Sequence, residues 1–258
     1  MSNKPQRTKK DQRQAAAAKV AEMRRQQAAA ERKRRILLGS VIAVVVLIIV
    51  GGAVYLQSTR DPATTSGSSA TPTGLTAEGG ILRGQDAAPA KLVVYEDFMC
   101  PICGEFEQLS KSVLDLDVSK GTLQVEYRPI SFLDRESNGT EYSTRAANAF
   151  ACVADNAGND AALTMHNLLY ASQPAENTDG LPDSQLVDLA VQAGASRSAV
   201  QTCVDDQTYR SWVAKVTEQS SKDGVNGTPT AVLNGSALTI ADTMNPTALQ
   251  QAIDTAAS

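Results

Sequence analysis

Residues 92–103 read LVVYEDFMCPIC and decide the fold of the C-terminal part of the chain. Leu92–Glu96 is apolar and rich in β-branched side chains, which is typical of a buried strand. The segment after Cys103 places apolar residues three or four positions apart, as on one face of a helix: Phe106, Leu109, Val113 and Leu116. The pattern predicts a strand that leads directly into a helix, with a Cys-x-x-Cys pair at the junction.

This Cys-x-x-Cys pair predicts redox chemistry. The unpaired N–H groups of a first helical turn stabilise negative charge, so they lower the pKa of Cys100 and favour its nucleophilic thiolate. Cys103, one turn further on, is placed to form a disulfide with Cys100 or to resolve a mixed disulfide. Pro101 suits the first turn because its missing N–H needs no partner there. We therefore expect Cys100 to be the attacking thiol.

Half of a zinc site is the other use of such a pair. Zinc needs four ligands, usually including a second close pair. The remaining candidates are Cys152, Cys203 and the single histidine, His166, and they form no second Cys-x-x-Cys. We expect no metal, and we interpret His166 as a solvated helix residue. One histidine also provides no Ser/His/Asp triad or Cys/His pair by proximity in the sequence.

The remainder of this part alternates between helical and extended patterns at Gly, Pro, Asn and Asp residues. Further strands are expected at Leu123–Arg128, Thr230–Leu233 and Ala237–Ile240, and a final helix from about Pro246. Between the second and third strands lie five candidate helices: Ser143–Asp155, Ala161–Ala171, Ser184–Ala193, Ser196–Asp205 and Thr208–Lys222. The order predicts an α/β domain with a helical insertion at about residues 131–225.

The N-terminal part contains an uncharged apolar run at residues 36–56, which would be about 30 Å long as a helix. A cleaved signal peptide has a shorter apolar core and a short basic start. We therefore expect an uncleaved transmembrane signal-anchor helix. Its basic flank should keep residues 1–35 in the cytoplasm and place the rest of the chain outside the cell membrane.

The net charge of −4 hides a strong asymmetry. Residues 1–35 hold 12 Lys or Arg and three Asp or Glu, a net charge of +9, whereas the remaining residues carry −13. This split excludes a uniformly basic nucleic-acid binder, and we interpret the basic tail as a topology signal. Residues 57–80 are rich in Ser, Thr, Pro and Gly, which predicts a flexible linker to a folded domain at 81–258.

A Gly-Thr-Pro-Thr segment at residues 227–230 precedes the third strand. Together with the strand–CPIC–helix unit, it resembles the thioredoxin-fold thiol oxidoreductases, whose cis-proline loop faces the active disulfide. The helical insertion and the Cys-Pro-x-Cys form are similar to the DsbA-like branch, in particular to membrane-anchored members from Gram-positive bacteria. The matching pieces are residues 95–98, 142–147, 151–155 and 228–230, and the resemblance covers about Lys91 to Ala256.

This resemblance implies an extracytoplasmic thiol:disulfide oxidoreductase that oxidises cysteines of secreted proteins without a cofactor. It implies reoxidation by a membrane quinone-linked partner of the DsbB or VKOR type, and substrate contacts at Thr228 and Pro229. A disulfide reductase or isomerase, for example one serving cytochrome c maturation, is the alternative, because Cys-x-x-Cys alone does not fix the direction of exchange. A redox-inert, membrane-tethered binding module is the alternative from another class.

Two departures from the DsbA pattern concern charge near the thiols. Ile102 stands where that pattern has a histidine that helps to stabilise the thiolate, and Val94 stands where it has an acid. Glu96 and Asp97 are the nearest carboxylates and are candidates to relay a proton to or from Cys103. Ordinary solvation at the strand end is the alternative reading, and side-chain alternation should let at most one of the two face the interior.

Cys152 and Cys203 lie in the predicted insertion, outside the membrane, where disulfides persist. Free buried thiols and a structural bridge are both compatible with their positions. The resemblance favours the bridge.

Overall fold

The structure is a computed structural model, and it describes residues 70–258. The predicted tail at 1–35, the predicted transmembrane helix at 36–56 and the first part of the predicted linker lie outside the described residues. Between residues 70 and 258, no helix is long and apolar enough to cross a membrane.

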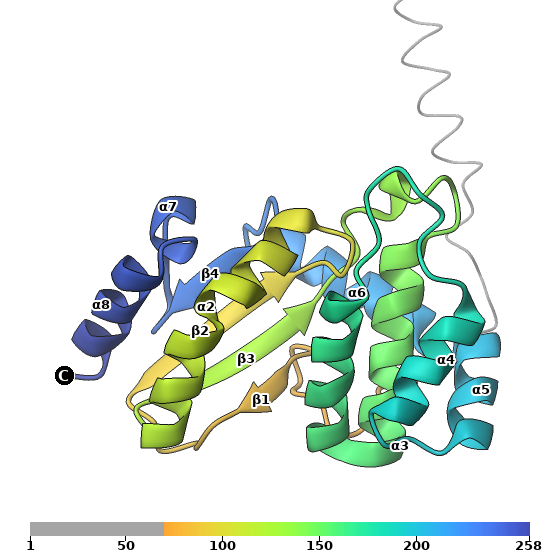
Figure 1. Ribbon diagram of the computed structural model, residues 1–258, viewed down its shortest axis with the longest axis horizontal. Coiled ribbons are helices and arrows are strands. Elements are labelled where there is room, and N and C mark those ends of the chain that lie inside the picture. Colours follow the sequence, from red (N-terminus) through yellow and green to blue (C-terminus); the bar gives the residue numbers. More distant parts are fainter. Residues whose placement is uncertain (1–69) are drawn as a thin grey trace, which may run out of the picture. The chain divides into compact units, whose positions relative to one another are not determined.

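A five-stranded sheet organises the domain, with the strand order β1-β3-β2-β4-β5 (Figure 1). Its strands are β1 (Ile81–Arg83), β2 (Ala90–Glu96), β3 (Leu123–Pro129), β4 (Thr230–Leu233) and β5 (Ser236–Ala237). The central strand, β2, runs parallel to β3 and antiparallel to β4, and Val94 lies opposite Tyr127 and Ala231 in the register. This central position accounts for the apolar sequence of β2.

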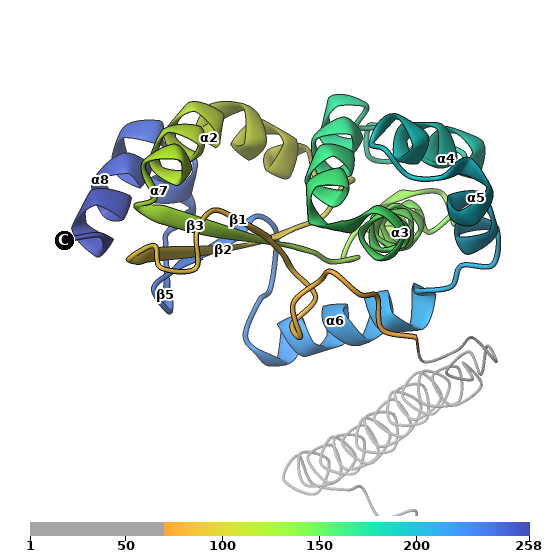
Figure 2. The same ribbon diagram turned by 90° about the horizontal axis from the view of Figure 1, so that it is seen from below.

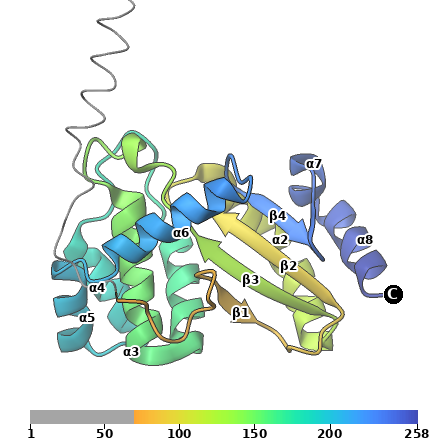
Figure 3. The same ribbon diagram turned by 180° about the vertical axis from the view of Figure 1, so that it is seen from behind.

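Helices cover both faces of the sheet (Figures 2 and 3). The helices α2 (Pro101–Lys120) and α8 (Pro246–Ala256) pack together on one face, and α6 (Arg210–Lys222) crosses the other. Since both faces are covered where β2 ends, neighbouring side chains there are buried whichever face they point to. The expectation that at most one of Glu96 and Asp97 faces the interior is therefore wrong, because both are 0% exposed.

The ends of α2 follow from its local sequence. Cys100 precedes the helix with an extended backbone, and Pro101 occupies the first turn, as predicted. The helix ends at Gly121, whose φ of 73° lies in the left-handed region. This conformation lets the Gly121 N–H donate to the carbonyls of Asp117 and Val118, which a helix end would otherwise leave unpaired.

The buried face of α2 differs from the predicted one. Leu109 and Leu116 are 37% and 48% exposed, whereas the buried residues are Cys103, Gly104, Phe106, Ser110, Leu114 and Asp117. Hydrogen bonding accounts for part of this rotation, because the buried Asp117 carboxylate accepts hydrogen bonds from Thr122 and from Gln250 of α8. A hydrophobicity pattern does not register such a buried carboxylate.

The helical insertion lies where the sequence predicts it. It contains α3 (Tyr142–Ala171), α4 (Asp183–Gln192), α5 (Arg197–Asp205) and α6, and a short 3-10 helix, η1 (Asp134–Glu136), precedes it. The two helices expected at 143–155 and 161–171 form the single element α3, which is interrupted at Gly158. The φ of 81° at this residue belongs to the left-handed side of the backbone map, which glycine adopts without steric cost.

The C-terminal hairpin is shorter than predicted. The strand expected at Ala237–Ile240 stops after Ala237, and α7 (Ile240–Thr243) begins in its place. Thr239 causes this change, because its hydroxyl accepts a hydrogen bond from the Asp242 N–H at 3.1 Å and so caps the new helix.

Residues 70–80, at the end of the predicted linker, contact the domain. Thr73 donates from its backbone N–H and its hydroxyl to the Asp155 carboxylate, at 2.8 and 2.7 Å. The Thr76 hydroxyl donates to Glu126 at 2.6 Å. The predicted boundary between linker and domain is therefore too late in the chain.

A disulfide joins Cys152 of α3 to Cys203 of α5, with the two Cα atoms 5.9 Å apart. The bond spans a sequence separation of 51 residues and links two helices of the insertion. It lies within the helical region, away from the junction between β2 and α2.

We expect the double substitution Cys152→Ser, Cys203→Ser to lower the free energy of unfolding by about 2–4 kcal/mol, because the unfolded chain regains the entropy that the cross-link removes. Urea unfolding of the purified full chain, followed by circular dichroism, measures this loss. Dithiol oxidation by the folded double variant should remain close to that of the parent. Its complete loss would contradict a purely structural role for the bridge.

Candidate active site

The two cysteines of the CPIC segment lie where β2 passes into α2. The Cys100 carbonyl accepts hydrogen bonds from the N–H groups of Cys103 and Gly104, at 3.0 and 3.2 Å, and thereby closes the first turn of the helix. Both cysteines are present as thiols. Cys103 is 0% exposed and Cys100 only 6%, so the nucleophile candidate is less exposed than its place at a strand end suggests.

The loop before β4 covers Cys100. The Thr228–Pro229 peptide bond is cis, and the Cys100 thiol donates to the Thr228 carbonyl at 3.3 Å. The structure therefore brings together the CPIC segment and the Thr-Pro segment, which lie 128 positions apart in the sequence.

The surroundings of the two thiols shift their pKa values in opposite directions. A hydrogen bond from the Cys103 thiol, together with the backbone N–H groups of Cys103 and Ile102, lowers the pKa of Cys100 to about 6, although burial opposes this shift. Burial raises the pKa of Cys103 far above its usual value, and the contact with Cys100 and the charge of Glu96 add to the effect. At neutral pH the pair therefore holds a thiolate at Cys100 and a thiol at Cys103.

Asp97 fixes the loop that carries Cys100. Its Oδ1 accepts hydrogen bonds from the Met99 N–H at 2.9 Å and the Ser143 hydroxyl at 2.6 Å, and its Oδ2 accepts one from the Leu133 N–H at 2.9 Å. Burial raises the pKa of Asp97 to about 6, although these three hydrogen bonds oppose the shift. With both oxygens engaged, this residue anchors the active-site loop to the start of the helical insertion.

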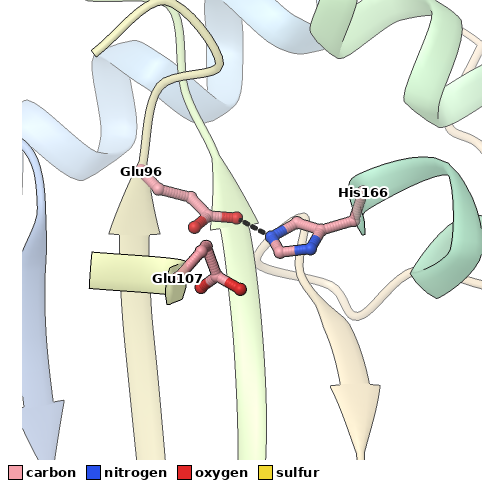
Figure 4. Close-up of side chains that lie close together, drawn as sticks. All are labelled: Glu96, Glu107 and His166. Atoms are coloured by element: carbon pink, nitrogen blue, oxygen red, sulfur yellow. Dashed lines mark hydrogen bonds and ion pairs between the residues drawn. The ribbon is translucent and has the colours of Figure 1, made fainter. Parts of the chain in front are cut away.

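Glu96 contacts His166, which we expected to be exposed to solvent. Its Oε1 pairs closely with Nε2 of His166, which is 1% exposed (Figure 4). The prediction of a solvated histidine is therefore wrong. Three aromatic rings lie within 6.0 Å of the imidazole, those of Phe98, Tyr127 and Tyr170. Burial alone would lower the pKa of His166, but the charges of Glu96 and Glu107 raise it to about 9.

His166 was interpreted as solvated and Glu107 was not singled out, although buried neighbours mark both positions. His166 directly follows the buried Met165, on a helix whose buried face continues at Leu169. Glu107 directly follows the buried Phe106 and lies one turn beyond Cys103, so helical spacing places it on the same side of α2. Buried apolar neighbours at such spacing are the signal that identifies both residues.

A groove opens beside Cys100 and has a volume of about 550 Å³. We call it the Cys100 groove. Its lining combines apolar, basic and acidic side chains from the segment after β3, the loop between α3 and α4, and the loop before β4, among them Phe132, Leu133, Arg135, Glu176 and Thr228. Cys100 forms part of its wall.

Residues 76–255 match the model of a protein family described as Thioredoxin. The chain belongs to the thioredoxin family. This match spans the sheet, the Cys-x-x-Cys junction and the helical insertion, and so includes every element that forms the site.

Two kinds of curated relative match part of this chain. The serine/threonine-protein kinase PknE of Mycobacterium tuberculosis is 31% identical over 157 residues, which cover 58% of this chain and 28% of the kinase. The Na(+)/H(+) antiporter NhaA 3 of Salinispora tropica is 27% identical over 157 residues, covering 60% of this chain and 21% of the antiporter. The chain thus spans about a quarter of the length of these relatives.

Solved structures of thioredoxin-family oxidoreductases match more of the chain. The reduced disulfide bond oxidoreductase DsbG of Mycobacterium tuberculosis is 29% identical, with a TM-score of 0.57, and covers 69% of this chain and 92% of its own. Reduced DsbA from the same organism is 28% identical, with a TM-score of 0.54, and the match covers 69% of this chain and 98% of the DsbA chain. Oxidised BdbD of Bacillus subtilis is 21% identical, with a TM-score of 0.62, and the match covers 73% of this chain and 98% of the BdbD chain. At this identity the match supports the fold alone. The fold is therefore that of the DsbA-like thiol-disulfide oxidoreductases.

We expect alkylation of Cys100 by iodoacetamide to be half-maximal near pH 6 in the reduced full chain, because only the thiolate reacts. Cys103, buried and protonated, should label far more slowly. Cys103→Ser retains a hydroxyl donor and should leave the Cys100 pKa near 6, whereas Cys103→Ala should raise it by about one unit through the lost hydrogen bond. A midpoint at 8.5 or above in the parent, or preferential labelling of Cys103, would contradict the assignment of Cys100 as the nucleophile.

Proposed function

We propose that this chain is a membrane-anchored thiol:disulfide oxidoreductase that oxidises cysteines of secreted and cell-envelope proteins through Cys100 and Cys103. The observation that carries the proposal is the asymmetry between the two thiols, with the pKa of Cys100 lowered to about 6 and that of Cys103 raised. A dithiol that serves only to stabilise the fold has no need of this separation.

In the proposed reaction, a substrate thiolate attacks the Cys100 sulfur of the Cys100–Cys103 disulfide. A mixed disulfide forms, and Cys103 leaves and takes up a proton because its pKa is high. A second substrate thiolate then attacks the substrate sulfur of the mixed disulfide and releases Cys100 as a stable thiolate. Two electrons pass from the two substrate thiols to the enzyme disulfide, so the substrate leaves oxidised and the enzyme reduced.

The pKa of Cys100 also favours the direction of exchange. At neutral pH, a cysteine with a pKa of about 6 is mostly ionised, which stabilises the reduced form relative to the disulfide. A stabilised reduced form makes the disulfide a stronger oxidant. This supports an oxidase over a reductase.

Substrate binding is assigned to the Cys100 groove. An extended peptide in this groove would lie against Thr228 and Pro229, which stand between Cys100 and β4. Pro229 lacks an N–H, so pairing with a substrate backbone would fall to its neighbours. Pro101 and Ile102 flank the nucleophile on the other side, and the 42% exposure of Ile102 leaves an apolar contact for the substrate.

Anchoring and reoxidation complete the proposal. Residues 36–56 would hold the domain at the outer face of the cell membrane, with the basic residues 1–35 in the cytoplasm. A membrane quinone-linked protein of the DsbB or VKOR type would restore the disulfide, and the chain itself needs no cofactor for the exchange.

The reduction potential decides between the oxidase and its main alternative. Equilibration of the full chain with glutathione buffers should give a value between about −230 and −120 mV, more oxidising than the roughly −270 mV of thioredoxin. A value near that of thioredoxin would instead favour a disulfide reductase. Cys100→Ala should abolish oxidation of a reduced test protein, and unchanged activity in this variant would contradict the proposed reaction.

Trapping tests the order of the two cysteines. Incubated with a disulfide-bonded test protein, Cys103→Ala should accumulate mixed disulfides: the Cys100 thiolate attacks the substrate disulfide and releases one substrate thiolate, and the intramolecular thiol that would displace the bound substrate is gone. Cys100→Ala is the matched control and should trap none. Non-reducing electrophoresis with mass spectrometry identifies the adducts, and trapping by Cys100→Ala alone would reverse the assignment.

A further inference from the structure

A second cluster of chemically active side chains lies behind the dithiol. Glu96 comes from the end of β2, Glu107 from α2 and His166 from α3, so three elements converge at one point (Figure 4). One ligand atom from each residue can be chosen so that all three lie within 4.8 Å of one another. None of the three forms a bond in the dithiol exchange described above, although the charge of Glu96 contributes to the raised pKa of Cys103.

The cluster contains buried carboxylate oxygens that lack hydrogen-bond donors. Glu96 is fully buried, and its Oε2 has no partner. The Oε1 atom of Glu107 is buried as well and also has no partner. A buried acceptor without a donor is unfavourable, because it has lost its water and gained nothing in return. Two such oxygens beside one imidazole indicate a place for a cation.

The imidazole is oriented for coordination. Its Nδ1 lies 3.4 Å from Oδ1 of Asn167, on the side away from the carboxylates, while Nε2 faces Glu96. Without a metal, Nε2 carries the proton that it shares with the Glu96 carboxylate. Loss of this proton on metal binding would leave a lone pair on Nε2, while Nδ1 keeps its contact with Asn167. The surrounding ring of Tyr127, with its centroid 4.4 Å from that of His166, restricts rotation of the imidazole.

The neighbouring basic side chains are engaged elsewhere. Arg83 and Lys111 border the cluster, but both pair with Asp115 on the exposed side of α2. Among the ion pairs of residues 70–258, none involves Glu107, and Glu96 pairs only with His166. Once the imidazole has lost its proton to solvent, two ionised carboxylates and the neutral ring carry a formal charge of −2, which matches a divalent cation.

A route from solvent reaches the cluster. A cavity of about 90 Å³ borders Glu107 and is lined by Arg83, Lys111, Tyr127, Leu163 and Asn167. Its polar lining allows a hydrated ion to approach Glu107 first, before the ion loses water and reaches the buried Glu96 and His166.

We propose that Glu96, Glu107 and His166 form a binding site for a divalent transition-metal ion, with Zn²⁺ as the best match. One imidazole nitrogen and two carboxylate oxygens are donors that Zn²⁺ accepts, with bonds of about 2.0–2.2 Å. Such bonds place the ligand atoms about 3.4 Å apart in a tetrahedral site, so small side-chain movements suffice. The fourth position is left to water. Binding displaces the imidazole proton, as is general for histidine ligands.

The test removes the redox cysteines first, so that the Cys-x-x-Cys pair cannot bind the ion. The full chain with Cys100→Ser and Cys103→Ser is titrated with Zn²⁺ by calorimetry at pH 8, and Co²⁺ is used as a spectroscopic probe. One Zn²⁺ should bind per chain, and Co²⁺ should give visible ligand-field bands without a thiolate charge-transfer band. The site is thereby examined independently of the proposed oxidoreductase activity.

Substitutions assign the ligands in this background. Glu107→Gln and His166→Gln should each weaken Zn²⁺ binding at least about 10-fold and change the Co²⁺ spectrum. Glu105→Gln is the matched control, because Glu105 is an exposed carboxylate on the same helix. The Zn²⁺ affinity of this variant should equal that of the cysteine-free parent. Glu107→Gln remains informative if the buried His166→Gln does not fold, because Glu107 borders the solvent route.

Two results would overturn the proposal: absence of stoichiometric Zn²⁺ binding in the cysteine-free background, or equal affinity in Glu107→Gln and Glu105→Gln. Either result would leave the dithiol reaction untouched, because that reaction is tested by reduction potential and trapping in chains with intact cysteines.

Discussion

The buried carboxylate of Asp97 is the interaction on which the rest of the site depends. It lies between the end of the central strand and the first cysteine, and it accepts hydrogen bonds from three donors. One of these is the Met99 N–H within the same loop, and the others are Leu133 after β3 and Ser143 at the start of α3. The position of Cys100 is thus set by the helical insertion as well as by the sheet.

The same junction explains why two chemically identical side chains behave differently. Cys100 stands just outside the helix, where N–H groups converge, whereas Cys103 is one turn inside and fully buried. The difference in pKa arises mainly from the hydrogen bond that the Cys103 thiol gives to Cys100 and from the burial of Cys103. No basic side chain is required, which is why Ile102 is compatible with a reactive thiol at this position.

Much of the architecture could be predicted from the sequence because it rests on local signals. The strand–CPIC–helix junction, the helical insertion and the place of the Thr-Pro segment follow from apolar periodicity and from proline. The errors concern contacts between distant residues. The hydrogen bonds of Asp117 alter the buried face of α2, and the aromatic shell around His166 removes that residue from solvent. A local sequence pattern predicts neither contact, because each contact depends on which helices and strands meet in the fold.

The short outer strands of the sheet have a consequence for the proposed reaction, in which the domain would meet unfolded chains. An unpaired strand edge is a template for any extended polypeptide, and long flat edges promote aggregation. Here β1 has three residues and β5 has two, so each border offers few free backbone groups. An extended polypeptide would therefore form few backbone hydrogen bonds at either border of the sheet. If non-native polypeptides bind near Cys100 as proposed, the sheet edges would give them little tendency to coaggregate with the domain.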